Sequence, residues 1–373
     1  MSVQGRLAAR VPGVRYLRRP GTHDAPAFDL AYVRTGPRAH TPVLVIPGGP
    51  GLASVLPSWP LRARAKRWGL DLIMVEHRGV GLSRRSVDGR ALPPAAMRIE
   101  DVIEDLAATL EAEGVESAVV YGASYGSYLA AGFGALHPER VAAMVLDSPI
   151  LTANDYLVER RYLRSLLWEG ATEPSALPPG VPAALSAHVR ALVAAGVDDT
   201  EVLECARAAV ELGGPAFATR LLAARRRGRG RPLWWALHTY ARRDRLPGPL
   251  LSHIYEFDVV GTIAFREMHY APPLDGEEFD SAHTYRALAP RYPRFACEPF
   301  DLVRELPRFD WPTRILTGAN DLRTPTEIAD RAASLIPGAE LCRLPGGHSA
   351  LESNMTAALT HMNALARGLG PGR

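Results

Sequence analysis

One stretch decides the fold: Ala118-Val119-Val120-Tyr121-Gly122-Ala123-Ser124-Tyr125-Gly126-Ser127-Tyr128-Leu129. Its apolar beginning predicts a buried strand, and the residues that follow Gly126 predict a helix. A strand that becomes a helix within one residue places that residue in a strained conformation. Its neighbours two positions away must be small, because the two backbones pass close together. The stretch therefore predicts Ser124 at the apex of a turn flanked by Gly122 and Gly126, with its hydroxyl pushed out of the sheet.

Composition is that of an ordinary globular protein, with 373 residues, 47% hydrophobic and 22% charged, and a formal net charge of +3. The densest basic run, 225–231, has no interleaved aromatic residues. We interpret it as a solvated loop, and we expect no nucleic-acid partner. The cysteines Cys205, Cys297 and Cys342 are far apart and form no C-x-x-C pair. This spacing argues against a zinc site or a disulfide framework and suits a reducing compartment.

The first twenty residues contain several arginines and no apolar segment of the kind found in secretory signals. No apolar run approaches the length needed to cross a bilayer. We therefore expect a cytoplasmic protein with no membrane partner. The sequence does not indicate an oligomeric state.

Strand and helix patterns alternate on both sides of Ser124. The predicted strands are 28–34, 43–46, 70–75, 118–121, 141–146, 313–318 and 340–344. Apolar residues spaced three and four apart predict an amphipathic helix over 98–113. Another helix is expected to begin at Thr324 as N-cap, with Pro325 in the first helical position, and a last helix over 350–369. Such alternation predicts an α/β fold, a mostly parallel sheet with helices on both faces.

The region 151–308 has helical patterns without the strand–helix alternation. We interpret it as a helical lid inserted into a core formed by residues 1–150 and 309–373. Active sites of open parallel sheets lie at the carboxyl ends of the strands. Ser124 lies at such an end, and the lid is expected to cover it.

A serine hydroxyl needs a base to accept its proton, and the base needs a carboxylate to orient it. In this fold both should follow Ser124, the acid first, in loops that come after later strands. Asp321 follows the strand over 313–318, and His348 follows the strand over 340–344. They are our candidates for acid and base. Asp147, after the strand over 141–146, is the rival acid.

The tetrahedral intermediate of acyl transfer needs hydrogen-bond donors for its oxyanion. The N–H of Tyr125, first in the helix after the nucleophile, is one candidate. The second should come from the glycine-rich turn 47–51, and we choose Gly49, since glycine lets a backbone N–H approach a substrate closely. A phosphate cradle is the competing interpretation of this turn, but the Gly-Lys-Ser/Thr ending of a P-loop is absent.

Four motifs together resemble the α/β-hydrolase superfamily, and within it the branch of proline iminopeptidases and related aminopeptidases. They are Pro47-Gly48-Gly49-Pro50-Gly51, Arg78-Gly79-Val80-Gly81-Leu82-Ser83, Gly122-Ala123-Ser124-Tyr125-Gly126 and Gly346-Gly347-His348-Ser349. The resemblance covers 40–150 and 310–350, and the lid matches more weakly. Pro47 stands where the family has histidine, and Glu76 where it has aspartate. Pro47 removes a polar side chain beside the expected substrate position.

The resemblance also implies a substrate site, because lid glutamates of that branch bind the free amine of the substrate. Two lid fragments are similar, Trp168-Glu169-Gly170-Ala171-Thr172 and Glu267-Met268-His269-Tyr270. Carried over, Glu169 and Glu267 hold the ammonium group. Glu256, Asp258 and Glu298 are other lid acids that could do so.

The sequence thus predicts a serine hydrolase with Ser124 as nucleophile and no metal or organic cofactor. An aminopeptidase of the proline iminopeptidase type, acting on short peptides or amides, is the first hypothesis for its function. An esterase, or a pathway-specific hydrolase or acyl-transfer enzyme for a small metabolite, is the alternative. A non-catalytic protein that only binds a ligand is a third hypothesis, against which the complete set of Ser124, Asp321 and His348 argues.

Overall fold

A computed structural model describes residues 3–171, 180–245 and 251–368. Within these ranges the strands form one eight-stranded sheet. Its order is β1 (Val14–Arg19), β2 (Phe28–Thr35), β4 (Leu72–Val75), β3 (Val43–Ile46), β5 (Ala118–Ala123), β6 (Val141–Asp147), β7 (Thr313–Gly318) and β8 (Glu340–Leu344). The run from β4 to β8 is parallel, and β2 is antiparallel to both of its neighbours. The prediction of an α/β fold with a mostly parallel sheet is confirmed.

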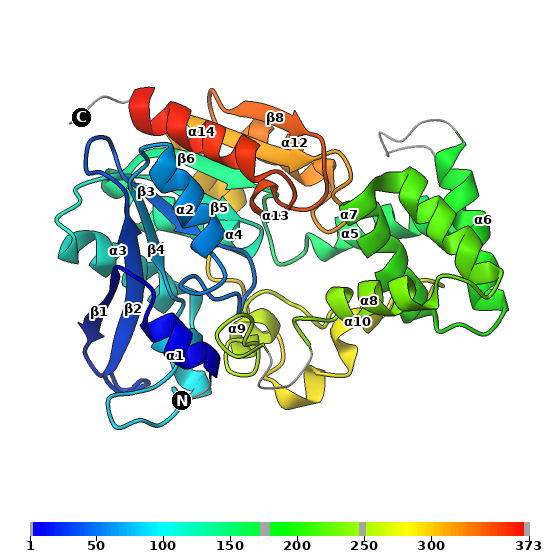
Figure 1. Ribbon diagram of the computed structural model, residues 1–373, viewed down its shortest axis with the longest axis horizontal. Helices are drawn as coiled ribbons and strands as arrows, with labels where there is room; N and C mark the ends of the chain where they lie inside the picture. The colour runs from blue at the N-terminus through cyan, green and yellow to red at the C-terminus, as the bar shows by residue number, and fades with distance from the viewer. Residues whose placement is uncertain (1–2, 172–179, 246–250, 369–373) are drawn as a thin grey trace.

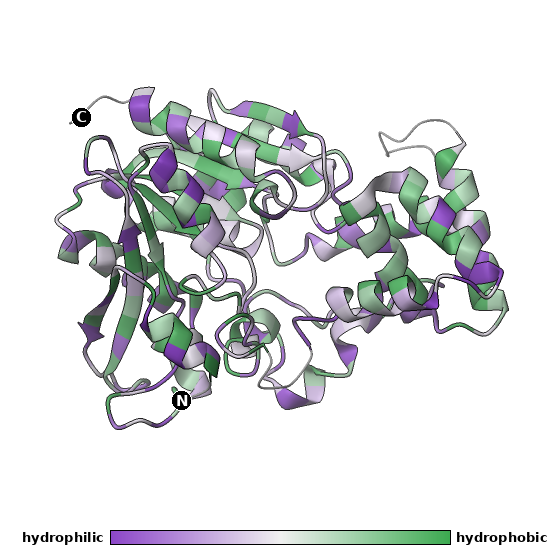
Figure 2. Cartoon of the chain, in the orientation of Figure 1, coloured by the Kyte–Doolittle hydropathy of each residue, from purple (hydrophilic) through white to green (hydrophobic). Residues whose placement is uncertain are grey.

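Both faces of the sheet are buried, because the central strands are apolar at every position. On β3, Leu44 and Ile46 pack on one face, and Val43 and Val45 on the other. The first face is covered by α3 (Ile99–Ala112), α4 (Tyr125–Leu136) and α12 (Thr326–Leu335). The second is covered by α2 (Trp59–Arg67) and α14 (Met355–Gly368), which lie side by side in Figure 1. Figure 2 shows the resulting pattern, with apolar strands inside and hydrophilic residues on the outer helices.

An inserted helical region, which we call the lid, lies between β6 and β7 in the chain (green to yellow in Figure 1). Its main helices are α5 (Tyr156–Leu163), α6 (Val181–Ala194), α7 (Asp199–Arg226) and α8 (Arg231–Ala241), with a π-helical turn over Arg164–Glu169. The shorter helices α9 (Gly261–Arg266) and α10 (His283–Arg286) follow. Residues such as Leu163, Leu185 and Leu203 give the lid an apolar core of its own. None of the helices in the described ranges is long and apolar enough to cross a membrane.

Several elements differ from the sequence prediction. Helix α1 (Val3–Ala9), strand β1 and helix α2 had no clear pattern, because their outer faces are polar. The predicted last helix is two helices, α13 (Ala350–Ser353) and α14, separated at Asn354, and Leu369 lies outside the described residues. Thr324 does not cap α12: the N-cap is Pro325, and the Thr324 hydroxyl donates to Asp321 instead.

Backbones come close together around the turn between β5 and α4. A Cβ atom on Gly126 would lie 2.2 Å from the carbonyl oxygen of Ile46, and one on Gly122 would lie 2.2 Å from the carbonyl oxygen of Gly126. Real Cβ atoms do not approach backbone oxygens this closely, so each contact requires glycine. These glycines place the end of β3 directly against the first turn of α4.

We predict that Gly126→Ala lowers the melting temperature by about 5 °C or more, since the added methyl group must displace backbone rather than a flexible side chain. Gly368→Ala is the matched control, because a Cβ there meets nothing within 4 Å. Thermal unfolding of the two variants beside the wild type measures the difference. Equal melting temperatures would show that the β3–α4 contact can relax.

Candidate active site

Ser124 is the residue between the end of β5 and the beginning of α4. Its backbone has φ 53° and ψ −122°, a conformation that residues with a Cβ rarely adopt. Such strain persists only where the surrounding structure holds it, as the glycine contacts do here. The turn predicted from the sequence is therefore present, and it places Ser124 at the carboxyl end of a central strand.

The Ser124 hydroxyl and two side chains from distant loops form a continuous hydrogen-bonded chain. Ser124 Oγ lies 2.8 Å from His348 Nε2. His348 Nδ1 lies 3.0 and 3.1 Å from the two carboxylate oxygens of Asp321. Because an ionised carboxylate can only accept, Nδ1 carries the proton, and Nε2 is left to accept from the serine hydroxyl. His348 and Asp321 are 7% and 2% exposed, so little water competes for these bonds.

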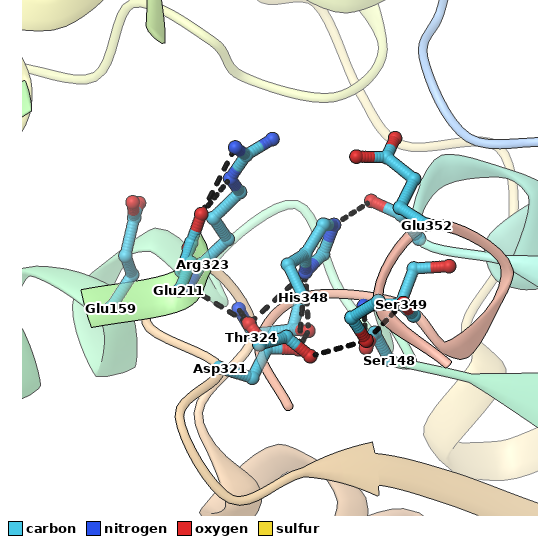
Figure 3. Close-up of polar contacts among 12 residues, drawn as sticks. Ser148, Glu159, Glu211, Asp321, Arg323, Thr324, His348, Ser349 and Glu352 are labelled. Carbon is cyan, nitrogen blue, oxygen red and sulfur yellow. Dashed lines mark hydrogen bonds and ion pairs between the residues drawn. The ribbon is translucent and has the colours of Figure 1, made fainter. Parts of the chain in front are cut away.

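Asp321 is held as an anion by its own loop, and Figure 3 shows it beside Thr324 and His348. Arg323 N and Thr324 N donate to Oδ1 at 3.0 Å, and Thr324 Oγ1 donates to Oδ2 at 2.9 Å. Burial alone would raise the pKa of Asp321. The charge and hydrogen bond of His348, together with hydrogen-bond donors such as the Thr324 N–H, instead lower this pKa to about 2. The carboxylate is therefore ionised throughout the range in which proteins are stable.

The pKa of His348 shifts in the opposite direction to that of Asp321. Burial lowers the pKa of its imidazole, but the negative charge and hydrogen bond of Asp321 outweigh burial and raise the pKa above its ordinary value. Arg323 opposes this rise and Glu211 supports it. The imidazole is thus a stronger base than a free histidine, with its accepting nitrogen aimed at Ser124.

Asp147, the rival acid, has a different set of partners. Its carboxylate accepts from Tyr121 Oη at 2.6 Å, from Ser349 Oγ at 2.9 Å and from Ala350 N at 2.9 Å. The contacts with Ser349 and Ala350 hold the segment that follows His348 against the end of β6, and the contact with Tyr121 comes from the neighbouring strand β5. Burial raises the pKa of Asp147 despite these donors. Asp147 positions the histidine loop, whereas Asp321 contacts the imidazole.

The glycine-rich turn after β3 borders the other side of Ser124. A Cβ on Gly48 would lie 3.3 Å from Ser124 Cβ, so the turn approaches the serine closely. Gly49 follows with φ 144°. Tyr125 is the first residue of α4, and the first N–H groups of a helix have no acceptor within it. Both candidate oxyanion donors, Gly49 and Tyr125, therefore adjoin the serine.

A cavity of about 340 Å³ contains these groups and is lined by residues of both the core and the lid. Ser124, His348, Gly48 and Gly49 line it from the core. Its apolar and aromatic lining from the lid includes Tyr156, Met268, His269, Tyr270 and Pro272. Its charged lining comprises Asp155, Glu159, Arg207, Arg243, Asp244, Arg323 and Glu352. The site can therefore enclose a small molecule that has both an apolar and a polar part.

Comparison with known proteins agrees with this architecture. Residues 41–173 match the family model described as alpha/beta hydrolase fold. A proline iminopeptidase of Heyndrickxia coagulans is 32% identical over 113 residues, 30% of this chain and 36% of that protein. A Caulobacter segnis protein named as a carbamate hydrolase, RutD, is 29% identical over 126 residues, 34% of this chain and 43% of that protein. Both matches span less than half of the relative.

The crystal structure of a proline iminopeptidase from Mycobacterium smegmatis covers 95% of this chain and 99% of its own, with a TM-score of 0.57 at 16% identity. At that identity the likeness shows the fold alone. The family match covers the β5–α4 turn, and the structural match extends the same architecture to both halves of the core. The chain has the α/β-hydrolase fold, and its residues 41–173 match the model of that family.

The two lid glutamates proposed as amine ligands do not line the cavity. Glu169 is exposed at the end of the π-helical turn, on the outside of the lid. Glu267 is buried, but its carboxylate accepts from Ile99 N at 2.8 Å and pairs with Arg266. The expectation for both residues is therefore corrected. Local similarity in a weakly matching lid did not show which way each side chain points.

The other lid acids considered also have structural partners. Glu256 accepts from Gly81 N at 2.5 Å, Asp258 pairs with Arg84, and Glu298 accepts from Ala153 N. The acids that do line the cavity include Glu159 and Asp244. No sequence signal distinguished these two, because each lies among other charged residues of an irregular lid. Across residues 3–171, 180–245 and 251–368, no group of three or more histidine, cysteine, aspartate or glutamate side chains is placed to hold a metal ion.

We predict that Asp321→Asn lowers kcat/KM by about four decades, because an amide no longer selects the imidazole tautomer that accepts from Ser124. Asp147→Asn is the matched comparison. It should lower the melting temperature, since it loosens the segment that follows His348, and it should lower kcat/KM much less than Asp321→Asn does. Hydrolysis of an aryl ester and thermal unfolding are measured for both variants. A larger loss of rate in Asp147→Asn would transfer the role of the acid to Asp147.

Proposed function

We propose that this protein is a serine hydrolase in which Ser124, His348 and Asp321 form the catalytic triad. The observation that supports this most directly is the unbroken hydrogen-bonded chain from Ser124 Oγ through His348 to Asp321. The chain ends at a serine that lines a cavity beside two candidate oxyanion donors. A protein that only bound a ligand would not need a strained serine with its proton acceptor in contact.

The proposed reaction proceeds through an acyl-enzyme. Ser124 Oγ attacks the substrate carbonyl carbon while its proton moves to His348 Nε2, and the carbonyl oxygen becomes an anion held by the N–H groups of Gly49 and Tyr125. The bond to the leaving group then breaks as His348 returns the proton to that group. Water, deprotonated by His348, attacks the ester on Ser124, and the proton finally restores the serine hydroxyl.

Within this class we propose an aminopeptidase that releases N-terminal residues from short peptides or amides. Glu159 takes the place of Glu169 and Glu267 as the group that binds the substrate ammonium. It lines the cavity, and its carboxylate pairs with Arg207 at 3.2 Å. Burial raises the pKa of Glu159, and the positive charges of Arg207, Arg323 and His348 oppose this rise. A buried carboxylate gains stability from a nearby cation, which a substrate ammonium supplies. The relative named as a proline iminopeptidase supports the same choice.

An esterase, or a hydrolase or acyl-transfer enzyme for a small metabolite, is the second candidate. The apolar and aromatic lining of the cavity supports it, because Tyr156, Met268 and Tyr270 can hold an apolar acyl group that has no amine. Glu159 already has Arg207 as a partner, so its charge does not require a cationic substrate. The relative named as a carbamate hydrolase shows that this fold segment is not restricted to peptidases.

We predict that Ser124→Ala folds normally and loses about three decades or more of turnover, because the attacking oxygen is gone. A fluorophosphonate probe should label the wild type at Ser124 and leave the variant unlabelled, which peptide mapping of the adduct measures. Substantial hydrolysis by the variant of every wild-type substrate would exclude Ser124 as the nucleophile.

For the substrate class, we predict that aminoacyl anilides are cleaved and that their N-acetylated forms are not. Glu159→Gln should raise KM for the free amine by about one to two decades, the contribution of one hydrogen bond between charged groups. It should leave simple aryl esters nearly unchanged. Glu169→Gln is the matched control, because Glu169 is exposed and lies outside the cavity. If the wild type prefers substrates without a free amine, the esterase proposal replaces the aminopeptidase proposal and the triad is unaffected.

A further inference from the structure

The glycine-rich turn that carries Gly49 makes few side-chain contacts of its own, because its glycines have no side chains. Gly48, Gly49 and Gly51 have no side chains, and Gly49 and Gly51 have φ values of 144° and 109°. Glycine has more conformational freedom than other residues, so such a segment takes its position from its neighbours. An oxyanion donor is effective only if it is fixed before the reaction. The neighbours of this turn therefore matter for the proposed chemistry.

Several of those neighbours belong to the lid. Ala53 N donates to Ile254 O at 3.0 Å, and Glu256 N donates to Gly51 O at 2.8 Å. A Cβ on Gly51 would lie 2.8 Å from Glu256 O, so the lid backbone is in direct contact with the turn. The segment 254–256 thus adds a short antiparallel bridge to the end of the turn.

A second lid contact reaches Gly49 itself. Tyr270 Oη donates to the carbonyl oxygen of Gly49 at 3.1 Å. The segment that carries Tyr270 is anchored to the core, because the Glu267 carboxylate accepts from Ile99 N at the beginning of α3. Burial raises the pKa of Tyr270, so its hydroxyl remains a donor across the pH range of an assay. Tyr270 therefore connects an anchored part of the lid to the residue proposed as an oxyanion donor.

We propose that Tyr270 is a positioning residue that holds Gly49 in the geometry of the oxyanion hole, so that the hole is complete only when the lid is in place. This inference rests on the proposed serine-hydrolase function. Ser124, His348 and Asp321 all come from the core, so their hydrogen bonds do not require Tyr270. The lid thereby controls stabilisation of the oxyanion without moving the triad.

Tyr270→Phe tests the proposal, since it removes only the hydroxyl. We expect kcat for an aryl ester to fall about ten- to hundredfold, less than the loss of an oxyanion donor itself, with KM changed less than about twofold. Phosphonylation by a fluorophosphonate should slow by a similar factor, because the phosphoryl oxygen occupies the same hole as Ser124 displaces fluoride. The apparent pKa on the acid side of the pH profile of kcat/KM, which is set by His348, should be the same as in the wild type. The melting temperature should also be unchanged.

Tyr292→Phe is the matched control. Tyr292 is a lid tyrosine that does not line the cavity, and its hydroxyl donates to the carbonyl oxygen of Phe257 at 3.3 Å, so its loss should leave phosphonylation unchanged. A Tyr270→Phe enzyme with wild-type kcat, or with a changed KM only, would overturn the proposal. A fall in kcat accompanied by a shift of that apparent pKa or a lower melting temperature would overturn it too, because the effect would then act on His348 or on the fold. Failure of the wild type to react at Ser124 would instead refute the proposed function.

Discussion

The close packing of backbones around the β5–α4 turn is the constraint on which the rest of the structure depends. Gly126 lies so near the Ile46 carbonyl that the end of β3 and the first turn of α4 are in contact without side chains between them. This contact leaves Ser124 in its strained conformation, and it brings the glycine-rich turn after β3 to the same place. Nucleophile and candidate oxyanion donors are thus neighbours because of one packing arrangement.

Buried carboxylates organise the loops at the carboxyl edge of the sheet. Asp147 accepts from the segment after His348, and Asp321 accepts from the backbone of its own loop as well as from the imidazole. Glu76, where the family has aspartate, accepts from Ser54 N at 2.6 Å and Val55 N at 2.8 Å. Burial raises the pKa of Glu76 to about 7 even against these donors. Each acid exchanges hydration for backbone N–H groups, which makes the loops rigid.

The lid contributes to the site through contacts as close as those of the core. Where α7 is kinked at Gly214, the backbone of Glu211 approaches Gly347, next to His348, and its carboxylate pairs with Arg323 at 3.0 Å. On the other side the lid backbone pairs with the turn that follows β3. The cavity is therefore formed jointly by the core and the lid. Its charged residues come from both, which explains why no single stretch of sequence reveals the substrate site.

The sequence by itself determined the strands from β2 to β8, the turn at Ser124 and the order of Asp321 and His348, because these depend on local patterns. An apolar strand, a glycine at a close contact and a loop after a strand can each be recognised within a few residues. The direction of lid side chains depends instead on long-range packing. Only the tertiary structure therefore shows that Glu169 is exposed, that Glu267 accepts from Ile99 N and that Glu159 lines the cavity. It also favours Asp321 over Asp147 as the candidate acid, since both follow strands and Asp321 is the one that contacts the imidazole of His348.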